Sequence, residues 1–183
     1  MGGATQTVRV NKEQAVKSRP DLLSPQSPDG IEVFQMTSDN SLPSCHVYME
    51  AQIVTPDSKR LLVHYCAHPH GPLKSHPKHA YLVCDLDDGE LYPITDHPAA
   101  TSPSLSPDGK QVYYFVDETR LGGGSLTLRC VNLDGTERQT VMVIDKPLPG
   151  GFRPSRIYPL STISSDGKRL ALPAFLGNGL PCR

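Results

Sequence analysis

Several features that would quickly narrow the function are missing from this sequence. Lys and Arg total 18 against 19 Asp and Glu, and the basic residues form no stripe. This balance argues against nucleic acid as a partner, since binding the phosphate backbone needs clustered positive charge. No run approaches the ~18 apolar residues of a membrane helix, and the first residues lack the apolar core of a signal peptide. We therefore expect neither nucleic acid nor membrane as a partner.

Signatures of catalysis and of cofactor binding are also scarce. The sequence has no Gly-rich phosphate loop, no nucleophile elbow and no His-Glu-x-x-His. No amphipathic helical window is longer than two turns. The cysteines form no C-x-x-C pair, and we expect them to be buried free thiols in a reducing compartment, with the cytoplasm as the expected location. They are Cys45, Cys66, Cys84, Cys130 and Cys182.

What the sequence does contain is an internal repeat. Three phrases share one pattern: Q-I-V-T-P-D-S-K-R-L-L-V at 52–63, P-S-L-S-P-D-G-K-Q-V-Y-Y at 103–114 and S-T-I-S-S-D-G-K-R-L-A-L at 161–172. Each places a tight turn with Asp and a small residue between two apolar runs, which predicts a β-hairpin. The aspartates of these turns, Asp57, Asp108 and Asp166, recur at nearly regular intervals. A repeat of about 40–50 residues made of strands indicates β-propeller blades.

A second hairpin follows each of the first two, turning at Asp87-Asp88-Gly89 and at Asp134-Gly135. Each repeat is then four strands in meander order, A to D, with A innermost. We predict an all-β propeller portion with one blade at 50–97, a second at 101–146 and a half blade at 158–176. An ordinary β-sandwich is the alternative, although it predicts less regular spacing. Because a ring needs about 4–8 blades, we expect the chain to be part of a larger, seven-bladed propeller whose C-terminal blades it lacks.

The residues before the first blade suggest how such a ring closes. The segment D-G-I-E-V-F-Q-M-T-S-D at 29–39 aligns with the D-strand segment at 88–97, so we predict an outer strand at 30–37 without a C strand of its own. Residues 1–28, with three prolines among Ser and Asp, are expected to form a flexible tail. The propeller domain is then expected at 29–183.

The meander sorts the connections onto two faces of the blades. The A–B and C–D turns are short and uniform, whereas the D–A and B–C connections are long. All seven histidines lie in these long connections or beside them. Function is usually carried by loops on a rigid frame. His46 precedes Asp57 by the same interval at which His97 precedes Asp108, and this interval counted back from Asp166 reaches Ser155, beside Arg156.

These positions lead into the innermost strands, so we expect their side chains at the mouth of the central channel. His46, Tyr48, His97 and Arg156 are therefore the predicted substrate-binding residues. Imidazole and guanidinium groups around one mouth suit an anionic ligand through charge-assisted hydrogen bonds. The alternative for both histidines is that they cap loop carbonyls at the surface.

The loop at 65–79 is the place where a metal site could be suspected. It contains His68-x-His70 and His76-x-x-His79, but also three prolines and no nearby carboxylate. A metal site needs three or four converging ligands. We therefore predict no metal ligand and assign no catalytic residue in this chain.

The opening phrase F-Q-M-T-S-D-N-S-L-P-S-C-H-V-Y-M-E-A-Q-I-V-T-P-D-S-K-R-L-L-V at 34–63 resembles the N-terminus of the oligogalacturonate lyases. There, an outer strand ending in a Thr-Asp turn leads to a His-x-Tyr phrase and the first hairpin. The S-P-D-G-K repeats resemble those of Tol-system bacterial propellers. The resemblance covers roughly 30–176. Only His46 and Tyr48 match the His-x-Tyr phrase.

This resemblance implies a seven-bladed ring, a divalent, manganese-like metal, and β-elimination on short pectin fragments. It also implies that the metal ligands and the catalytic base lie in the second half of the ring, beyond Arg183. The leading hypothesis is therefore a full-length lyase acting on acidic pectin-derived oligosaccharides, of which this chain alone is inactive and holds no metal. The competing hypothesis is a non-catalytic propeller that binds a protein partner through its loop face.

Overall fold

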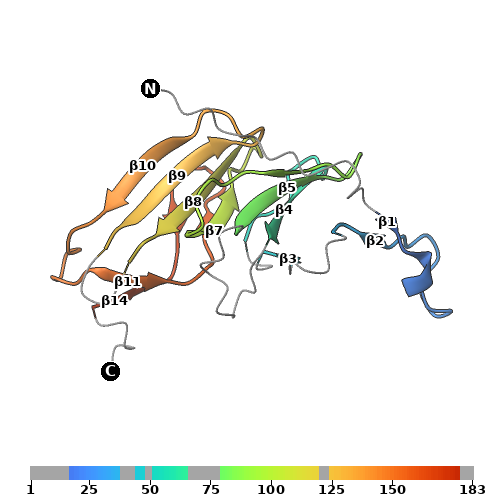
Figure 1. The fold of residues 1–183 in the computed structure, drawn as a ribbon, viewed down its shortest axis with the longest axis horizontal. Helices are drawn as coiled ribbons and strands as arrows, with labels where there is room; N and C mark the ends of the chain where they lie inside the picture. Colours follow the sequence, from blue (N-terminus) through green and yellow to red (C-terminus); the bar gives the residue numbers. More distant parts are fainter. Residues whose placement is uncertain (1–16, 38–43, 48–50, 66–78, 120–123, 178–183) are drawn as a thin grey trace.

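The computed structural model describes residues 17–37, 44–47, 51–65, 79–119 and 124–177. Within these ranges the chain is all-β, with no α-helix and one short 3-10 turn, η2 (Pro20–Leu22). Its strands form separate antiparallel sheets that lie side by side (Figure 1). The all-β class predicted from the repeat is therefore confirmed. None of the described segments is a helix long and apolar enough to cross a membrane.

The first sheet is a four-stranded meander in the order β3-β4-β5-β6. Its strands are β3 (Ser44–His46), β4 (Arg60–Tyr65), β5 (Ala80–Asp85) and β6 (Leu91–Pro93). The innermost strand has two pieces, because beyond β3 an isolated bridge pairs Val54 with Leu61. The sheet thus begins at Ser44, earlier than the predicted start at residue 50. The phrase S-C-H at 44–46 is polar and lacks the apolar alternation that marks a strand.

The second sheet repeats this plan in full. It has the order β10-β9-β8-β7 and consists of β7 (Ala100–Leu105), β8 (Gln111–Asp117), β9 (Leu126–Asn132) and β10 (Gln139–Ile144). Cys84 on β5 and Cys130 on β9 are fully buried free thiols. They occupy corresponding third strands, and their burial as free thiols is as predicted from the sequence.

Within the described residues, the third repeat consists of two paired strands, each interrupted. β11 (Pro154–Ile157) pairs with β14 (Ala174–Leu176), and β12 (Thr162–Ile163) pairs with β13 (Leu170–Ala171). Together they form one long hairpin around the turn at Asp166. The hairpin begins at Pro154, ahead of the predicted start at residue 158.

The three A–B turns have the same local chemistry. In the first, the Thr55 hydroxyl donates to Asp57 Oδ1 at 2.6 Å, and the Lys59 backbone N–H donates to the same oxygen at 3.1 Å. Ser106 with Asp108 and Ser164 with Asp166 repeat this arrangement. Two hydrogen bonds hold the pKa of each of these carboxyls below its usual value, and the one from the hydroxyl has a larger effect than the one from the backbone N–H. The residue after each Asp has positive φ, between 58° and 70°.

The turns of neighbouring sheets lie against one another. A Cβ added at Gly109 would be 2.6 Å from Pro56 Cδ in the first turn, and one at Gly167 would be 3.9 Å from Pro107 Cδ in the second. The innermost strands are also joined, because the Leu105 N–H donates to the Gln52 carbonyl at 3.0 Å. The repeats are therefore stacked in register, as propeller blades are.

The main core lies between the first two sheets. It joins Leu62, Tyr81 and Val83 of the first sheet to Tyr114 and Val131 of the second. Each large apolar side chain buried in this way contributes about 1.5–3 kcal/mol. A smaller core between the second sheet and the third hairpin contains Phe115, Leu126, Leu128 and Ile157.

The outer strand predicted at 30–37 is paired, although not with a C strand of a blade. β2 (Phe34–Gln35) pairs with β1 (Lys17–Ser18), a strand that was not predicted. The Arg19 guanidinium supports the pairing by donating to Gln35 Oε1 at 2.6 Å. β1 lies in the segment expected as a tail, and no apolar pattern there marks it as a strand. The division at residue 28 stays a prediction.

Candidate functional site

The predicted loop-face residues lie at the strand ends opposite the Asp turns. His46 pairs with Val63 on β4, and Arg156 pairs with Phe175 on β14. Both pairs lie toward the end of their hairpin that is far from the Asp turn. His97 precedes β7, whose first residue pairs with Val116 near the far end of β8. Each residue thus lies at the other end of its hairpin from Asp57, Asp108 or Asp166, as the meander predicts.

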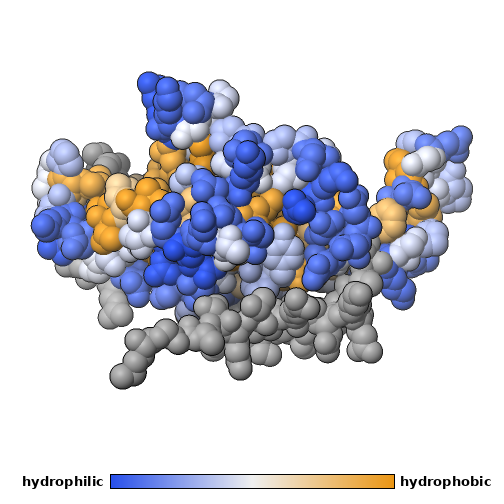
Figure 2. Space-filling view, turned by 90° about the horizontal axis from the view of Figure 1, so that it is seen from above, coloured by the Kyte–Doolittle hydropathy of each residue, from blue (hydrophilic) through white to orange (hydrophobic). Residues whose placement is uncertain are grey.

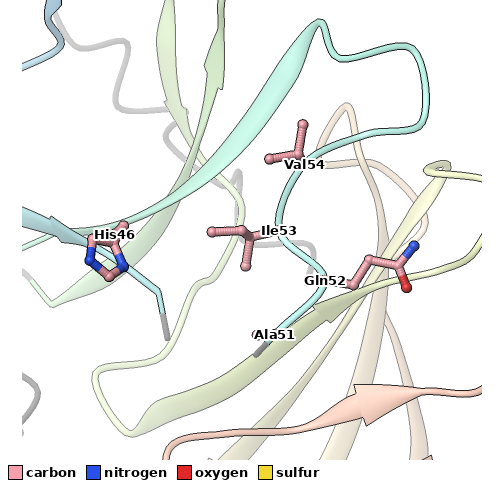
Figure 3. Close-up of a pocket in the computed structure, with 5 residues that line it drawn as sticks. All are labelled: His46, Ala51, Gln52, Ile53 and Val54. Atoms are coloured by element: carbon pink, nitrogen blue, oxygen red, sulfur yellow. The ribbon is translucent and has the colours of Figure 1, made fainter. Parts of the chain in front are cut away.

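His46 lies at the edge of an open pocket of about 550 Å³. The other lining residues are consecutive: Ala51, Gln52, Ile53 and Val54. They belong to the continuation of the innermost strand, and the side chains of Gln52 and Ile53 leave the backbone in opposite directions (Figure 3). The pocket is therefore an aliphatic wall on the first blade's inner strand with one imidazole at its edge. Tyr48, predicted beside His46, lies outside the described residues.

The tautomer of His46 follows from its hydrogen bond to the backbone. Its Nδ1 contacts the Val47 carbonyl oxygen, which can only accept, so Nδ1 carries a proton. Nε2 is then the nitrogen left to face a ligand. It accepts a hydrogen bond from a hydroxyl when the ring is neutral and donates one to a carboxylate when the ring is protonated.

His97 is engaged with its own loop, through a backbone N–H and not through the loop carbonyl that the alternative named. Its Nδ1 accepts a hydrogen bond from the Ala99 N–H at 3.1 Å, and its Nε2 lies 3.8 Å from Glu118 Oε1. The nearby carboxylate makes this position less suited to an anionic ligand than His46. Its role in substrate binding stays a prediction.

Arg156 projects from β11 as an exposed side chain. Its guanidinium carbon lies 4.6 Å from the centre of the Phe175 ring, a cation–π contact that fixes the orientation of the charge. Among the described residues it forms no ion pair. Within the same part of the chain, no hydrogen bond or ion pair joins His46, His97 and Arg156 to one another. Their convergence on one ligand stays a prediction.

The structure also brings together a group that sequence analysis missed. His64 Nε2 lies 2.7 Å from His79 Nε2, and the His64 ring stacks on Tyr81 with centroids 4.6 Å apart. Burial, and secondarily the neighbouring His79, lower the pKa of His64 to about 3. The signal available in the sequence was a single His in the apolar strand Leu61-Leu62-Val63-His64-Tyr65. This signal does not identify His79 as the partner of His64.

A second missed cluster joins the first two blades. Asp96 lies 3.1 Å from Arg129 Nη1 and 3.0 Å from Arg138 Nη1, and the Tyr114 hydroxyl donates to it at 3.0 Å. Burial acts to raise the pKa of Asp96, but Arg138, Tyr114 and Arg129 outweigh it, and the pKa lies below its usual value. The Arg138 Nη2 also donates to the Ile94 carbonyl at 2.9 Å. All four side chains are used in holding the blades together.

The described ranges contain no group of three or more His, Cys, Asp or Glu side chains that could hold a metal ion. The residues present in this part of the chain therefore do not fit the divalent metal that the family resemblance implies. We assign no chemical step to it here.

Comparison with known proteins establishes the fold class. No protein-family model matches the chain. No curated protein matches it either. Among solved structures, an oligogalacturonate lyase from Vibrio parahaemolyticus matches with a TM-score of 0.59 at 18% identity, covering 82% of this chain and 34% of that one. An oligogalacturonate lyase in complex with manganese matches with a TM-score of 0.57 at 19% identity, covering 85% and 34%.

At these identities the similarity is one of fold. The chain is related in structure to β-propeller proteins, and it spans about a third of the length of these two solved structures.

Proposed function

We propose that the full-length protein is an oligogalacturonate lyase-like propeller that acts on acidic pectin-derived oligosaccharides by β-elimination. The described blades supply part of its substrate-binding face. The observation that carries this proposal is the position of His46, at an open pocket on the innermost strand of the first blade. The fold shared with two proteins named as oligogalacturonate lyases supports it.

The recognition chemistry follows from the charge of the substrate. An oligogalacturonide carries one carboxylate per sugar, and the sugar rings also present apolar faces. The aliphatic wall of Ala51, Ile53 and Val54 suits a ring face, while His46 Nε2 suits a hydroxyl or a carboxylate. Arg156, exposed and held over Phe175, adds a bidentate donor for a carboxylate.

In β-elimination, a base removes the proton on the carbon next to the uronate carboxylate, and positive groups stabilise the charge that develops. None of the described side chains is assigned as that base. The role proposed for this part of the protein is to bind and orient the substrate.

The proposal is tested by titrating the full-length protein with an oligogalacturonide in a calorimeter. The same oligosaccharide with methyl-esterified carboxylates serves as the control. We expect the ester to bind at least ~10-fold more weakly, because charge-assisted hydrogen bonds are lost. A parallel assay with added manganese follows the ultraviolet absorbance of the unsaturated product. Failure of both sugars to bind would contradict the proposal, and binding without product would limit it to a non-catalytic sugar-binding propeller.

A second candidate is a non-catalytic propeller that binds a protein partner. Val141, Met142 and Val143 on the edge strand β10 are 50%, 44% and 50% exposed. Figure 2 shows apolar surface at the end of the molecule that carries β10 and the third hairpin. Large exposed apolar patches mark interaction sites. This candidate predicts that Met142→Lys abolishes partner binding and leaves oligosaccharide binding unchanged.

A further inference from the structure

The loop end of the third hairpin carries both aromatic and basic side chains. Phe152 and Arg153 come directly before β11, and Arg156 lies on β11 and pairs with Phe175 of β14. Phe152 and both arginines are exposed. Figure 1 shows β11 and β14 at the end of the molecule away from β1 and β2. These four residues form an aromatic–basic cluster on a different blade from the His46 pocket.

Phe152 is held in place although it is largely exposed. In the segment before it, the Gly151 N–H donates to the Leu148 carbonyl at 2.9 Å, and the Leu148 N–H donates to the Phe152 carbonyl at 2.8 Å. A Cβ on Gly177 would lie 3.3 Å from Phe152 Cδ1, so the ring lies beside the bare backbone of this glycine. Phe152 is nevertheless 57% exposed, more than any other Phe or Tyr in the described ranges. The ring is therefore supported by backbone and still open to a ligand.

The positive charge of the cluster has no acidic neighbour along the chain. No Asp or Glu occurs at 146–165, and within the described ranges neither arginine of the cluster forms an ion pair. Asp117 approaches β11 from the second blade, but its carboxylate accepts hydrogen bonds from the Thr119 N–H and hydroxyl and from the Ile157 N–H. The two guanidinium groups are therefore left for a ligand.

Arg156 is oriented by an aromatic ring. Its guanidinium carbon lies 4.6 Å from the centre of the Phe175 ring, and among the described residues none accepts a hydrogen bond from it. Phe175 is two residues before Gly177, which corresponds to roughly 6–7 Å along a strand. Because Phe152 contacts Gly177 and Arg156 contacts Phe175, the open ring and this charge occupy neighbouring positions.

An open aromatic ring beside unpaired guanidinium groups favours one ligand chemistry. The C–H groups on the face of a sugar pack on an aromatic ring, and a carboxylate accepts two parallel hydrogen bonds from a guanidinium. A uronate unit carries both features, since its carboxylate is attached directly to the sugar ring. An inorganic anion would use the arginines alone, and a neutral sugar would use the phenylalanine alone.

We propose that the aromatic–basic cluster is a second uronate-binding subsite, in which the sugar ring packs on Phe152 and its carboxylate is bound by Arg153 and Arg156. This inference rests on the proposed function, because it names where a further unit of the same acidic oligosaccharide is held. It adds Phe152 and Arg153, which sequence analysis did not select, to the substrate-binding residues.

The aromatic part of the subsite is tested by calorimetric titration of the full-length protein with trigalacturonate. Phe152→Ala should weaken binding at least ~5-fold, and Phe152→Trp should keep the affinity within ~2-fold, because the packing needs a flat ring. Phe34→Ala is the matched control. Phe34 is 50% exposed on β2, at the other end of the molecule, and its loss should leave the affinity unchanged.

The basic part is tested with the same ligand and with its methyl ester. Arg153→Ala should weaken the binding of trigalacturonate at least ~5-fold, whereas Arg169→Ala, exposed beside the Asp166 turn, should leave it unchanged. With the methyl ester, Arg153→Ala should change the affinity less than ~2-fold, because the carboxylate is already absent, while Phe152→Ala should keep its effect. The two ligands thus separate the contribution of charge from that of ring packing.

Unchanged trigalacturonate binding in Phe152→Ala and Arg153→Ala would overturn the subsite and leave the proposed function standing. A lower melting temperature in both variants with unchanged affinity would also overturn it, because another part of the protein would then cover the cluster. Equal losses for acid and ester in Arg153→Ala would refute the carboxylate contact. If the unmodified protein bound neither ligand, the proposed function itself would fail, and the subsite with it.

Discussion

Gly109 offers a direct measure of how tightly neighbouring blades are packed. It has φ of +70°, and a Cβ at this position would lie 2.6 Å from Pro56 Cδ in the preceding blade's turn. Gly109→Ala should therefore cost about 1–2 kcal/mol for a left-handed backbone plus about 1–3 kcal/mol for overpacking. Gly167→Ala is the matched control, with the same φ but its Cβ an ordinary 3.9 Å from Pro107 Cδ. It should cost only the backbone part.

The comparison is made by urea unfolding monitored by circular dichroism. Gly135→Ala provides a second control within the same sheet as Gly109, since its φ is +85° and nothing lies within 4 Å of the added carbon. We expect the free energy of unfolding to fall by about 1–3 kcal/mol more in Gly109→Ala than in either control. The extra loss belongs to the contact between blades.

A double-mutant cycle with Pro56→Ala isolates that contact. Replacing the proline removes Cδ, so Gly109→Ala should cost about 1–3 kcal/mol less in the Pro56→Ala background. Equal losses in Gly109→Ala and Gly135→Ala, together with no coupling to Pro56, would refute the stacked-turn arrangement.

Three further outcomes are expected. Asp96→Asn should lower the free energy of unfolding by about 1–3 kcal/mol, because two arginines lose a half-buried partner. The control Asp87→Asn, which breaks an exposed pair with Lys59, should change the free energy of unfolding by less than about 1 kcal/mol. Similar values for the two variants would contradict a role for Asp96 in joining the blades. His64 has a folded pKa of about 3, below the ~6.5 of the unfolded chain, so its contribution is complete above ~6.5 and is lost as pH falls toward 3. About 2 kcal/mol should be lost by about pH 5, above the range in which carboxylates titrate, and a flat stability profile in urea between pH 6.5 and 5 would exclude this. In the full-length protein, Arg156→Ala should weaken oligogalacturonide binding by about 1–3 kcal/mol in calorimetry, whereas Lys168→Ala, on the turn face, should leave it unchanged; equal effects would remove Arg156 from the site.

The hairpins were predictable because their chemistry is local. At each A–B turn, a hydroxyl, an Asp and a residue with positive φ lie close together in the sequence, and the hydrogen bonds join near neighbours along the chain. Such contacts form with little dependence on the rest of the chain. The repeat of these turns, and the apolar strands between them, were sufficient to predict stacked four-stranded sheets.

The interrupted inner strands and the β1–β2 pair were missed for the opposite reason. β3 is polar, and it is a strand because β4 supplies the partners of its backbone hydrogen bonds. β1 pairs with β2, although the segment that contains η2 separates them in the sequence. Neither β1 nor β3 has an apolar period of its own. The pairing depends on backbone groups that every residue carries, and the sequence pattern does not report it.

The candidate site was predictable in part, for the same reason. Counting back from the Asp turns identified His46, His97 and Arg156 as loop-face residues, because the meander alternates the two faces regularly. It did not distinguish His46, which borders the pocket, from His97, which caps its own loop beside Glu118. Those outcomes depend on which side chain from a distant strand lies nearby.

The sequence by itself determined the class of fold, the order of strands in the two four-stranded sheets and the face on which the loops of the blades lie, because these follow from turn chemistry and the period of two. Only the tertiary structure decided that His64, His79 and Pro98 meet, and that Asp96 joins Arg129 and Arg138. In each of these contacts the partners come from different strands or loops and are well separated in the sequence. Their contacts exist because sheet packing brings strand ends together, and the burial that comes with it makes the protonation of each group matter.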